Sequence, residues 1–108
     1  MLITVFRSRL KPDLTEEYNA AVARMSELAE TMPGYISHKT FFAADGERCT
    51  IVEFEHKDGL RTWRANAEHI AAQKNARLKY YTEYSVQVCT LDRESRFNEA
   101  EHAAKARA

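Results

Sequence analysis

Residues that can bind or act on a small organic molecule lie close together in the stretch WRANAEHIAAQ, residues 63 to 73. Trp63, the only tryptophan, has a ring that can stack on an aromatic ligand and an N–H that can donate a hydrogen bond. His69 can take up a proton near neutral pH, and the amides of Asn66 and Gln73 can bind polar groups. This stretch is the first candidate for a site, although a lone tryptophan on an apolar helix face is equally typical of a core.

The direction of His69 depends on whether residues 60 to 78 form one helix or two. On one continuous helix, Trp63, Ile70 and Leu78 lie on the apolar face with Leu60, Ala67 and Ala71, and His69 faces solvent. The polar residues that border the apolar face of such a helix are Asn66, Gln73 and Arg77. If the helix breaks at Asn66, this residue is a strong N-cap for a second helix, and the new phase can turn His69 toward the interior. The sequence allows both arrangements.

The predicted strands supply further candidates. Ser8 shares one face of the first strand with Phe6, while Arg7 points to the other face. His38 falls on one face of the second strand, and like Ser8 it is either a satisfied inward polar group or a ligand contact. Tyr81 belongs to a group of tyrosines at the start of the last strand, where packing at an edge is typical and a hydroxyl can still reach a pocket.

Several other chemistries have no support in the sequence. The histidines and the two cysteines show no close metal-ligand spacing, and the three glycines form no phosphate-binding loop. Lysine plus arginine equals aspartate plus glutamate at 16 each, which argues against a nucleic-acid partner. No apolar run approaches the length of a membrane span, so we expect no membrane partner. Without a secretory signal, Cys49 and Cys89 are expected to be reduced thiols in the cytoplasm.

Hydrophobic patterning predicts an α+β fold. The predicted strands cover residues 2–10, 35–43, 48–55 and 80–91, and the predicted helices run from a cap at Asp13 to about Met32 and from Asp58 to about Leu78. Pro33-Gly34 ends the first helix, and Asp45-Gly46 marks a hairpin turn. The first helix has an apolar stripe at helical spacing, formed by Tyr18, Ala21, Val22, Met25, Leu28, Ala29 and Met32. The order of strands and helices is the ferredoxin-like split β-α-β arrangement, with both helices on one face of a four-stranded antiparallel sheet. Apolar side chains also follow the other face of each strand, which predicts a homodimer that buries this face.

The chain is predicted to be one domain, residues 1–91, followed by a tail, residues 92–108. The tail is charged and alanine-rich with one large apolar residue, Phe97. A frayed helix, a disordered end and an arm that docks on a second subunit are all compatible with this composition.

The sequence resembles the antibiotic biosynthesis monooxygenase family over about residues 1 to 91. The motifs that carry the resemblance are Pro33-Gly34-Tyr35, Glu53-Phe54-Glu55, Trp63-Arg64, His69, Ala72-Gln73 and Tyr80-Tyr81. The resemblance implies subunits that pair sheet against sheet into a dimeric α+β barrel, each with a cavity between helices and sheet. Some members oxidise phenolic or quinone-forming aromatics with dioxygen and no cofactor, and others bind and degrade haem.

The two branches imply different roles for the candidate residues. The haem-degrading branch has an asparagine on the first strand and a histidine ten residues after the tryptophan; here Ser8 or Arg7 and Gln73 stand at those positions, which argues against haem. In the cofactor-free branch, Trp63 would stack on the substrate, His69 would take the phenol proton, and Arg77 or Arg7 would stabilise the anion. We therefore expect a cofactor-independent monooxygenase, with haem binding or degradation and a non-catalytic small-molecule-binding dimer as alternatives.

Overall fold

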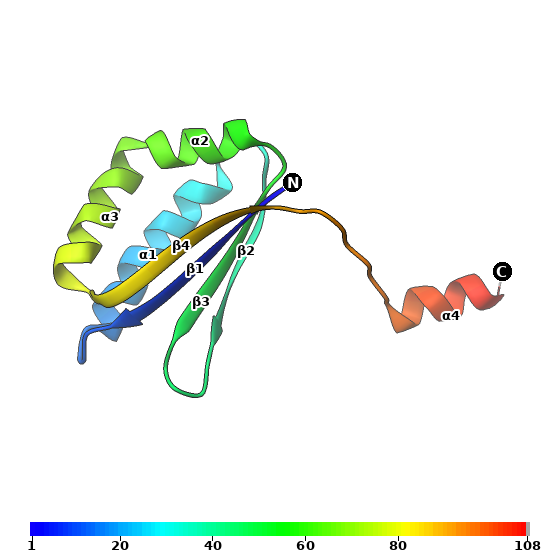
Figure 1. The fold of residues 1–108 in the computed structure, drawn as a ribbon, viewed down its shortest axis with the longest axis horizontal. Helices are drawn as coiled ribbons and strands as arrows, with labels where there is room; N and C mark the ends of the chain where they lie inside the picture. The colour runs from blue at the N-terminus through cyan, green and yellow to red at the C-terminus, as the bar shows by residue number, and fades with distance from the viewer. Residues whose placement is uncertain (108) are drawn as a thin grey trace.

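The computed structural model describes residues 1–107, which form eight regular elements. They are β1 (Leu2–Leu10), α1 (Thr15–Glu30), β2 (Tyr35–Phe42), β3 (Arg48–Phe54), α2 (Lys57–Ala65), α3 (Ala67–Lys79), β4 (Tyr81–Thr90) and α4 (Glu99–Arg107). The four strands closely match their predicted bounds. The second predicted helix is two helices, and a further short helix forms within the tail (Figure 1).

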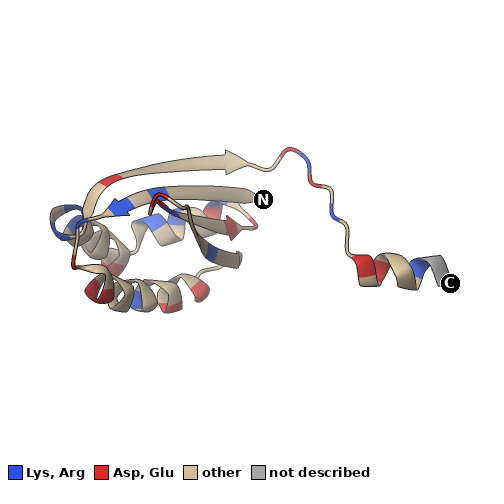
Figure 2. Ribbon diagram, turned by 90° about the horizontal axis from the view of Figure 1, so that it is seen from below, with Lys and Arg blue, Asp and Glu red and all other residues tan. Residues whose placement is uncertain are grey.

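The four strands form one antiparallel sheet in the order β2-β3-β1-β4. Helices α1, α2 and α3 all lie on one side of this sheet, as the view along the layers shows (Figure 2). The ferredoxin-like α+β fold is therefore confirmed. We call the side of the sheet that bears the helices the inner face and the other side the open face.

The core lies between the inner face and the helices, in two clusters at opposite ends of β1. At one end Leu2 packs with Phe54 of β3 and Leu60 of α2, and Trp63 packs against this group. At the other end Tyr18 of α1 packs with Ala76 and Tyr80. The predicted apolar stripe of α1 is confirmed, because its members from Tyr18 to Ala29 are buried or half-buried.

The start of α1 differs from the prediction. Asp13 is predicted to cap this helix, but it adopts a left-handed conformation with φ of 66° in the turn before it. The N-cap position falls on Leu14, and no described side chain caps this end of the helix. Aspartate tolerates the left-handed region better than most residues, so the turn after Pro12 uses Asp13 for its backbone rather than for its carboxylate.

The second helical region breaks at Asn66, as the two-helix alternative requires. Asn66 has an extended backbone, with ψ of 124°, and its side-chain oxygen accepts a hydrogen bond from the backbone N–H of His69 at 3.0 Å. The single continuous helix is therefore wrong. Its predicted apolar face would have buried Ile70 and Leu78, and the structure leaves them 49% and 75% exposed.

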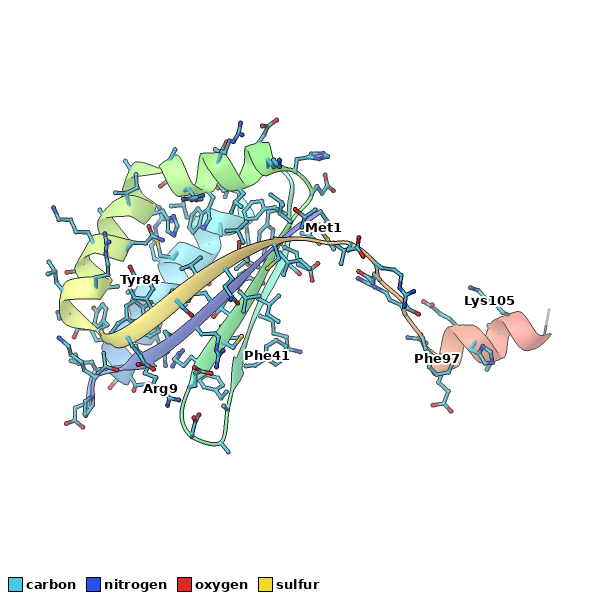
Figure 3. The ribbon with its side chains drawn as sticks, viewed as in Figure 1. Met1, Arg9, Phe41, Tyr84, Phe97 and Lys105 are labelled. Atoms are coloured by element: carbon cyan, nitrogen blue, oxygen red, sulfur yellow. The ribbon has the colours of Figure 1, made fainter. Side chains whose placement is uncertain are left out.

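The open face carries apolar side chains along its middle and paired charges toward one end. Ile3 and Val5 of β1 lie beside Ile51 of β3, and Phe41 of β2 remains 48% exposed (labelled in Figure 3). At the hairpin end, the side chains of Arg7 and Arg9 form ion pairs. These pairs are Arg7–Glu47 at 2.7 Å, Arg9–Asp45 at 2.7 Å and Arg9–Glu83 at 3.0 Å. Sheet-to-sheet pairing of two subunits stays a prediction.

The chain leaves the sheet after β4 and runs in an extended segment to α4, which stands well away from the rest of the structure (Figure 1). The side-chain oxygen of Asn98 accepts a hydrogen bond from the backbone N–H of Glu101 at 3.1 Å and so caps α4. Phe97 is 73% exposed and lies out on this arm (Figure 3), where its ring packs against that of His102. The division into a domain 1–91 and a tail 92–108 remains a prediction.

Within residues 1–107, none of the helices combines the length and apolar composition needed to cross a membrane.

Candidate functional site

The break at Asn66 brings Trp63 and His69 into direct contact. Their rings stack with centroids 3.7 Å apart and an angle of 17° between the ring planes. Residues 63 and 69 of one uninterrupted helix would point in widely different directions, because six residues correspond to about 600° of rotation. The turn at Asn66 removes this separation and places the imidazole half-buried against the indole.

A hydrogen bond determines which nitrogen of His69 carries a proton. Nδ1 lies 3.0 Å from the backbone carbonyl oxygen of Trp63. A carbonyl oxygen can only accept, so Nδ1 carries the hydrogen and donates it. In the neutral imidazole the lone pair then belongs to Nε2.

Burial lowers the pKa of His69 below its ordinary value of 6.5, and the hydrogen bond to the Trp63 carbonyl opposes this shift only in part. The imidazole is therefore mostly neutral at about pH 7. Its Nε2 is a hydrogen-bond acceptor and a general base that requires no prior loss of a proton.

A group of aromatic side chains marks the other end of the inner face. The hydroxyl oxygens of Tyr18 and Tyr81 lie 2.7 Å apart in a hydrogen bond, and the Tyr81 ring packs edge-on against Phe6 at 5.7 Å. Burial, followed by the hydrogen bond to Tyr18, raises the pKa of Tyr81 well above its ordinary value of 10. The Tyr81 phenol is thus neutral at physiological pH. Two hydroxyls share one hydrogen bond, so one hydroxyl hydrogen remains to be donated elsewhere.

A strip of β4 between these two ends is left partly uncovered by the helices. Tyr84, Val86 and Val88 lie on the inner face, because they stand opposite Ser8, Phe6 and Thr4 of β1. They are nevertheless 41%, 49% and 48% exposed. The fold therefore presents an accessible apolar surface along β4 on the inner face, and the Tyr84 ring at one end of it lies 5.5 Å from that of Tyr81.

The structure brings some of the predicted site residues together and separates others. Trp63, Asn66 and His69 meet at the α2–α3 junction, and Ser8 is buried on the inner face opposite Tyr84. Arg7 lies on the open face, where its guanidinium donates to Glu47, so it does not approach His69. The side chains of Gln73 and Arg77 are exposed on α3.

Three polar residues between the sheet and its covering helices have roles that the sequence patterns leave open or do not reveal. The helical pattern assigns Tyr18 only to the core stripe of α1, yet its hydroxyl pairs with that of Tyr81. His38 hydrogen-bonds the hydroxyl of Tyr35 on the inner face and is thereby a satisfied inward group. Arg48 is absent from the predicted site, although it stands opposite Ser8, and strand alternation is the signal that would have placed it inward.

The described residues do not match the donor set of the haem-degrading branch. Gln73, ten residues after Trp63, is exposed, and neither Ser8 nor Arg7 has the amide expected on β1. Gln73, Ser8 and Arg7 therefore do not supply the donor set of that branch. Separately, within residues 1–107, no three histidine, cysteine, aspartate or glutamate side chains come close enough together to hold a metal ion.

Comparison with known proteins agrees with this fold. The profile of the family described as antibiotic biosynthesis monooxygenase matches residues 1–75. The uncharacterised protein YqjZ of Bacillus subtilis (strain 168) is 32% identical over 95 residues, which cover 88% of this chain and 83% of YqjZ. The chain belongs to the antibiotic biosynthesis monooxygenase family.

Two solved structures share the fold at low sequence identity. Rv0793 from Mycobacterium tuberculosis superposes with a TM-score of 0.77 at 17% identity, covering 88% of this chain and 98% of its own. SnoaB, a cofactor-independent oxygenase from Streptomyces nogalater, gives a TM-score of 0.73 at 16% identity, covering 86% and 94%. At these identities the likeness shows the fold and leaves the activity to be argued from the site.

Proposed function

We propose that this protein is a cofactor-independent monooxygenase that oxidises a hydrophobic phenolic or quinone-forming small molecule with dioxygen. The observation that carries the proposal is the hydrogen bond between Nδ1 of His69 and the Trp63 carbonyl oxygen, which leaves Nε2 as the basic atom of the ring. The imidazole is half-buried, and burial lowers its pKa, so it is neutral and ready to accept a proton. The cofactor-independent oxygenase activity of the structural relative SnoaB supports the same reaction class.

The chemistry begins with transfer of the phenolic proton to Nε2 of His69. The resulting phenolate is electron-rich enough to reduce dioxygen directly, so the substrate supplies the electrons. One phenol and one O₂ give one quinone and one water: one oxygen atom forms the new carbonyl at the ring carbon that loses hydrogen, and the other leaves as water. The protein supplies the base, the binding surface and hydrogen bonds to the developing anion.

The other side chains have supporting roles in this proposal. One face of the Trp63 ring is covered by His69, so Trp63 chiefly holds the imidazole, and a ligand can meet only its remaining face or its N–H. The apolar strip of Tyr84, Val86 and Val88 would bind the hydrocarbon part of the substrate. The spare hydroxyl hydrogen of the Tyr18–Tyr81 pair can donate to a substrate oxygen. Arg7 has no role, because it lies on the open face.

The test is oxygen uptake by the purified protein with a panel of hydroxylated naphthalenes and anthrones, without flavin and with a chelator present. We expect uptake to match quinone formation one to one and His69→Ala to lower kcat by about 100-fold or more, as loss of a general base does. His56→Ala is the matched control, because His56 is an exposed histidine just before α2. Uptake no faster than in protein-free buffer, or uptake that survives His69→Ala, would refute the proposal.

A haemin titration separates this function from the haem alternative. Because Gln73 is exposed and β1 lacks the expected asparagine, we expect no sharp, stoichiometric Soret shift. A shift that is stoichiometric and lost in His69→Ala would instead make His69 a haem ligand. Saturable binding of the aromatic compounds without oxygen uptake would instead support the third interpretation, a non-catalytic dimer that binds a small molecule.

The assembly we propose is a homodimer that buries the open face. Ile3, Val5, Ile51 and Phe41 place apolar groups across its centre, and a face of this kind is typical of subunit interfaces. A cytoplasmic location is part of the same proposal, and the free thiols of Cys49 and Cys89 agree with a reducing compartment.

A further inference from the structure

A cavity lies at the hairpin end of the fold, away from the Trp63–His69 stack. It has a volume of about 330 Å³ and is bounded by the end of β1, the start of α1 and the β2–β3 hairpin. Its lining residues are Leu10, Lys11, Pro12, Thr15, Phe42, Gly46 and Arg48. Two of these are cations and none is an acid, so we call this space the Arg48 cavity.

Arg48 is held in place by aromatic rings rather than by a carboxylate. Its guanidinium carbon lies 4.9 Å from the centre of the Tyr18 ring and 4.8 Å from that of Phe42. Its Nη2 donates to the side-chain oxygen of Asn19 at 3.2 Å. These contacts orient a planar cation and leave most of its N–H donors available, since a guanidinium carries five.

Arg48 differs in this respect from the other arginines of the sheet. Arg7 and Arg9 each bind a carboxylate on the open face, at 2.7 Å in both cases. Over residues 1–107, Arg48 forms no ion pair with an acidic side chain. A half-buried guanidinium without a counter-ion gains more from an anionic ligand than an exposed, already paired one.

Lys11 supplies the second positive charge of the cavity. Its Nζ donates a long hydrogen bond, 3.4 Å, to the carbonyl oxygen of Leu78. Among the acids of the neighbouring segments, Asp45 pairs with Arg9 and Glu17 pairs with Lys79, while Asp13 and Glu16 are exposed and do not line the cavity. The lining residues themselves thus carry two positive charges and no negative charge beside apolar walls.

We propose that the Arg48 cavity is a binding site for an organic monocarboxylate with an apolar body. The guanidinium of Arg48 binds the carboxylate through two parallel N–H donors, and Lys11 supplies a second charge-assisted hydrogen bond. The hydroxyl of Thr15 lines the same space. Leu10, Pro12 and Phe42 would cover the hydrocarbon part, which distinguishes this ligand class from a free phosphate. None of the residues that line the cavity takes part in the proposed oxygenase chemistry, and Arg48 packs on the ring of Tyr18.

The test is an NMR titration of the full chain, labelled with ¹⁵N, with benzoate as the probe. We expect saturable shifts of the backbone amides of Leu10, Lys11, Thr15 and Gly46. The uncharged isostere benzamide and inorganic phosphate, titrated separately at constant ionic strength, should bind at least about tenfold more weakly, since each lacks either the charge or the apolar body. His69→Ala should bind benzoate unchanged, so failure of the oxygenase proposal would not affect this result.

Charge-removing variants assign the site to its residues. Arg48→Gln and Lys11→Gln should each weaken benzoate binding by about tenfold or more, because each removes a charge-assisted hydrogen bond. Arg61→Gln, at an exposed position of α2, is the matched control and should change nothing. If Arg48→Gln unfolds the chain, Lys11→Gln still tests the proposal. Absence of saturation, equal binding of benzamide or phosphate, or equal weakening by Arg61→Gln would each overturn the proposal.

Discussion

The side-chain oxygen of Asn66 accepts the backbone N–H of His69 at 3.0 Å, and this single bond starts α3 at a new rotational phase. The new phase turns the imidazole toward Trp63, where the rings stack at 3.7 Å. Asn66 therefore decides whether the proposed base faces solvent or the protein. Asn66 is a positioning residue, because its side chain bonds the backbone N–H of His69 and thereby sets the direction of the imidazole.

Replacing Asn66 with alanine removes the cap of α3. We expect a loss of about 1 kcal/mol in the free energy of unfolding, and Asn66→Asp should recover most of it because aspartate also caps well. Urea unfolding, followed by the fluorescence of Trp63, measures both variants. If Asn66→Ala leaves stability unchanged, the cap does not hold the start of α3.

The pKa of His69 should make stability depend on pH in a defined direction. Burial lowers the folded-state pKa below 6.5, while the unfolded chain titrates near 6.5. Between these two pKa values the unfolded state binds more protons. The contribution of His69 to the free energy of unfolding is therefore fully present above about pH 6.5. It falls as the pH drops from the unfolded-state pKa to the lower folded-state pKa. In His69→Gln, this part of the pH dependence should disappear from urea unfolding curves measured between about pH 5 and 8.

The hydroxyl pair of Tyr18 and Tyr81 should show energetic coupling. Tyr18→Phe and Tyr81→Phe each leave the other hydroxyl without its partner, and we expect a loss of about 1 kcal/mol for each. The double variant should lose clearly less than the sum of the two. Tyr84→Phe is the control, because Tyr84 is 41% exposed and its hydroxyl takes no part in this pair. Strict additivity in the denaturant-unfolding cycle would rule out the coupling.

A charge at the centre of the open face should dissociate the proposed dimer. Val5 lies at the middle of β1 on this face, opposite Ile51. Light scattering should give about twice the chain mass of 12.4 kDa for the wild type and about that mass itself for Val5→Lys, because a buried, unpaired ammonium is costly. Ala23→Lys, on the exposed side of α1, should remain dimeric. A monomeric wild type would remove the basis for burying this face.

Removal of residues 92–108 tests the predicted domain boundary. Helix α4 stands apart from the sheet and its covering helices, so a chain that ends at Leu91 should unfold within about 0.5 kcal/mol of the full chain (Figure 1). Light scattering on the shortened chain separates a free tail from an arm that joins two subunits. If the truncated chain is a monomer while the full chain is a dimer, α4 and Phe97 form part of the contact with the partner subunit.

Much of the fold can be predicted from the sequence, because local patterns determine it. Alternation in residues 2–10 predicts both the strand and which side chains share a face, and that strand is β1. Pro33-Gly34 and Asp45-Gly46 mark the turns, and Gly34 and Gly46 adopt the positive φ angles of 75° and 92° that favour glycine. The α1 stripe from Tyr18 to Ala29 is equally plain, since one helix face repeats every three to four residues.

The tertiary structure decided what depends on contacts between distant segments. The sequence allows His69 to face either way. In the structure, Trp63 packs against the core cluster of Leu2, Phe54 and Leu60, and the imidazole of His69 stacks on the indole held there. The pairing of Tyr18 with Tyr81 joins residues 63 positions apart, and the rings around Arg48 come from α1 and β2. No local period encodes such contacts, because they follow from how the helices pack on the sheet.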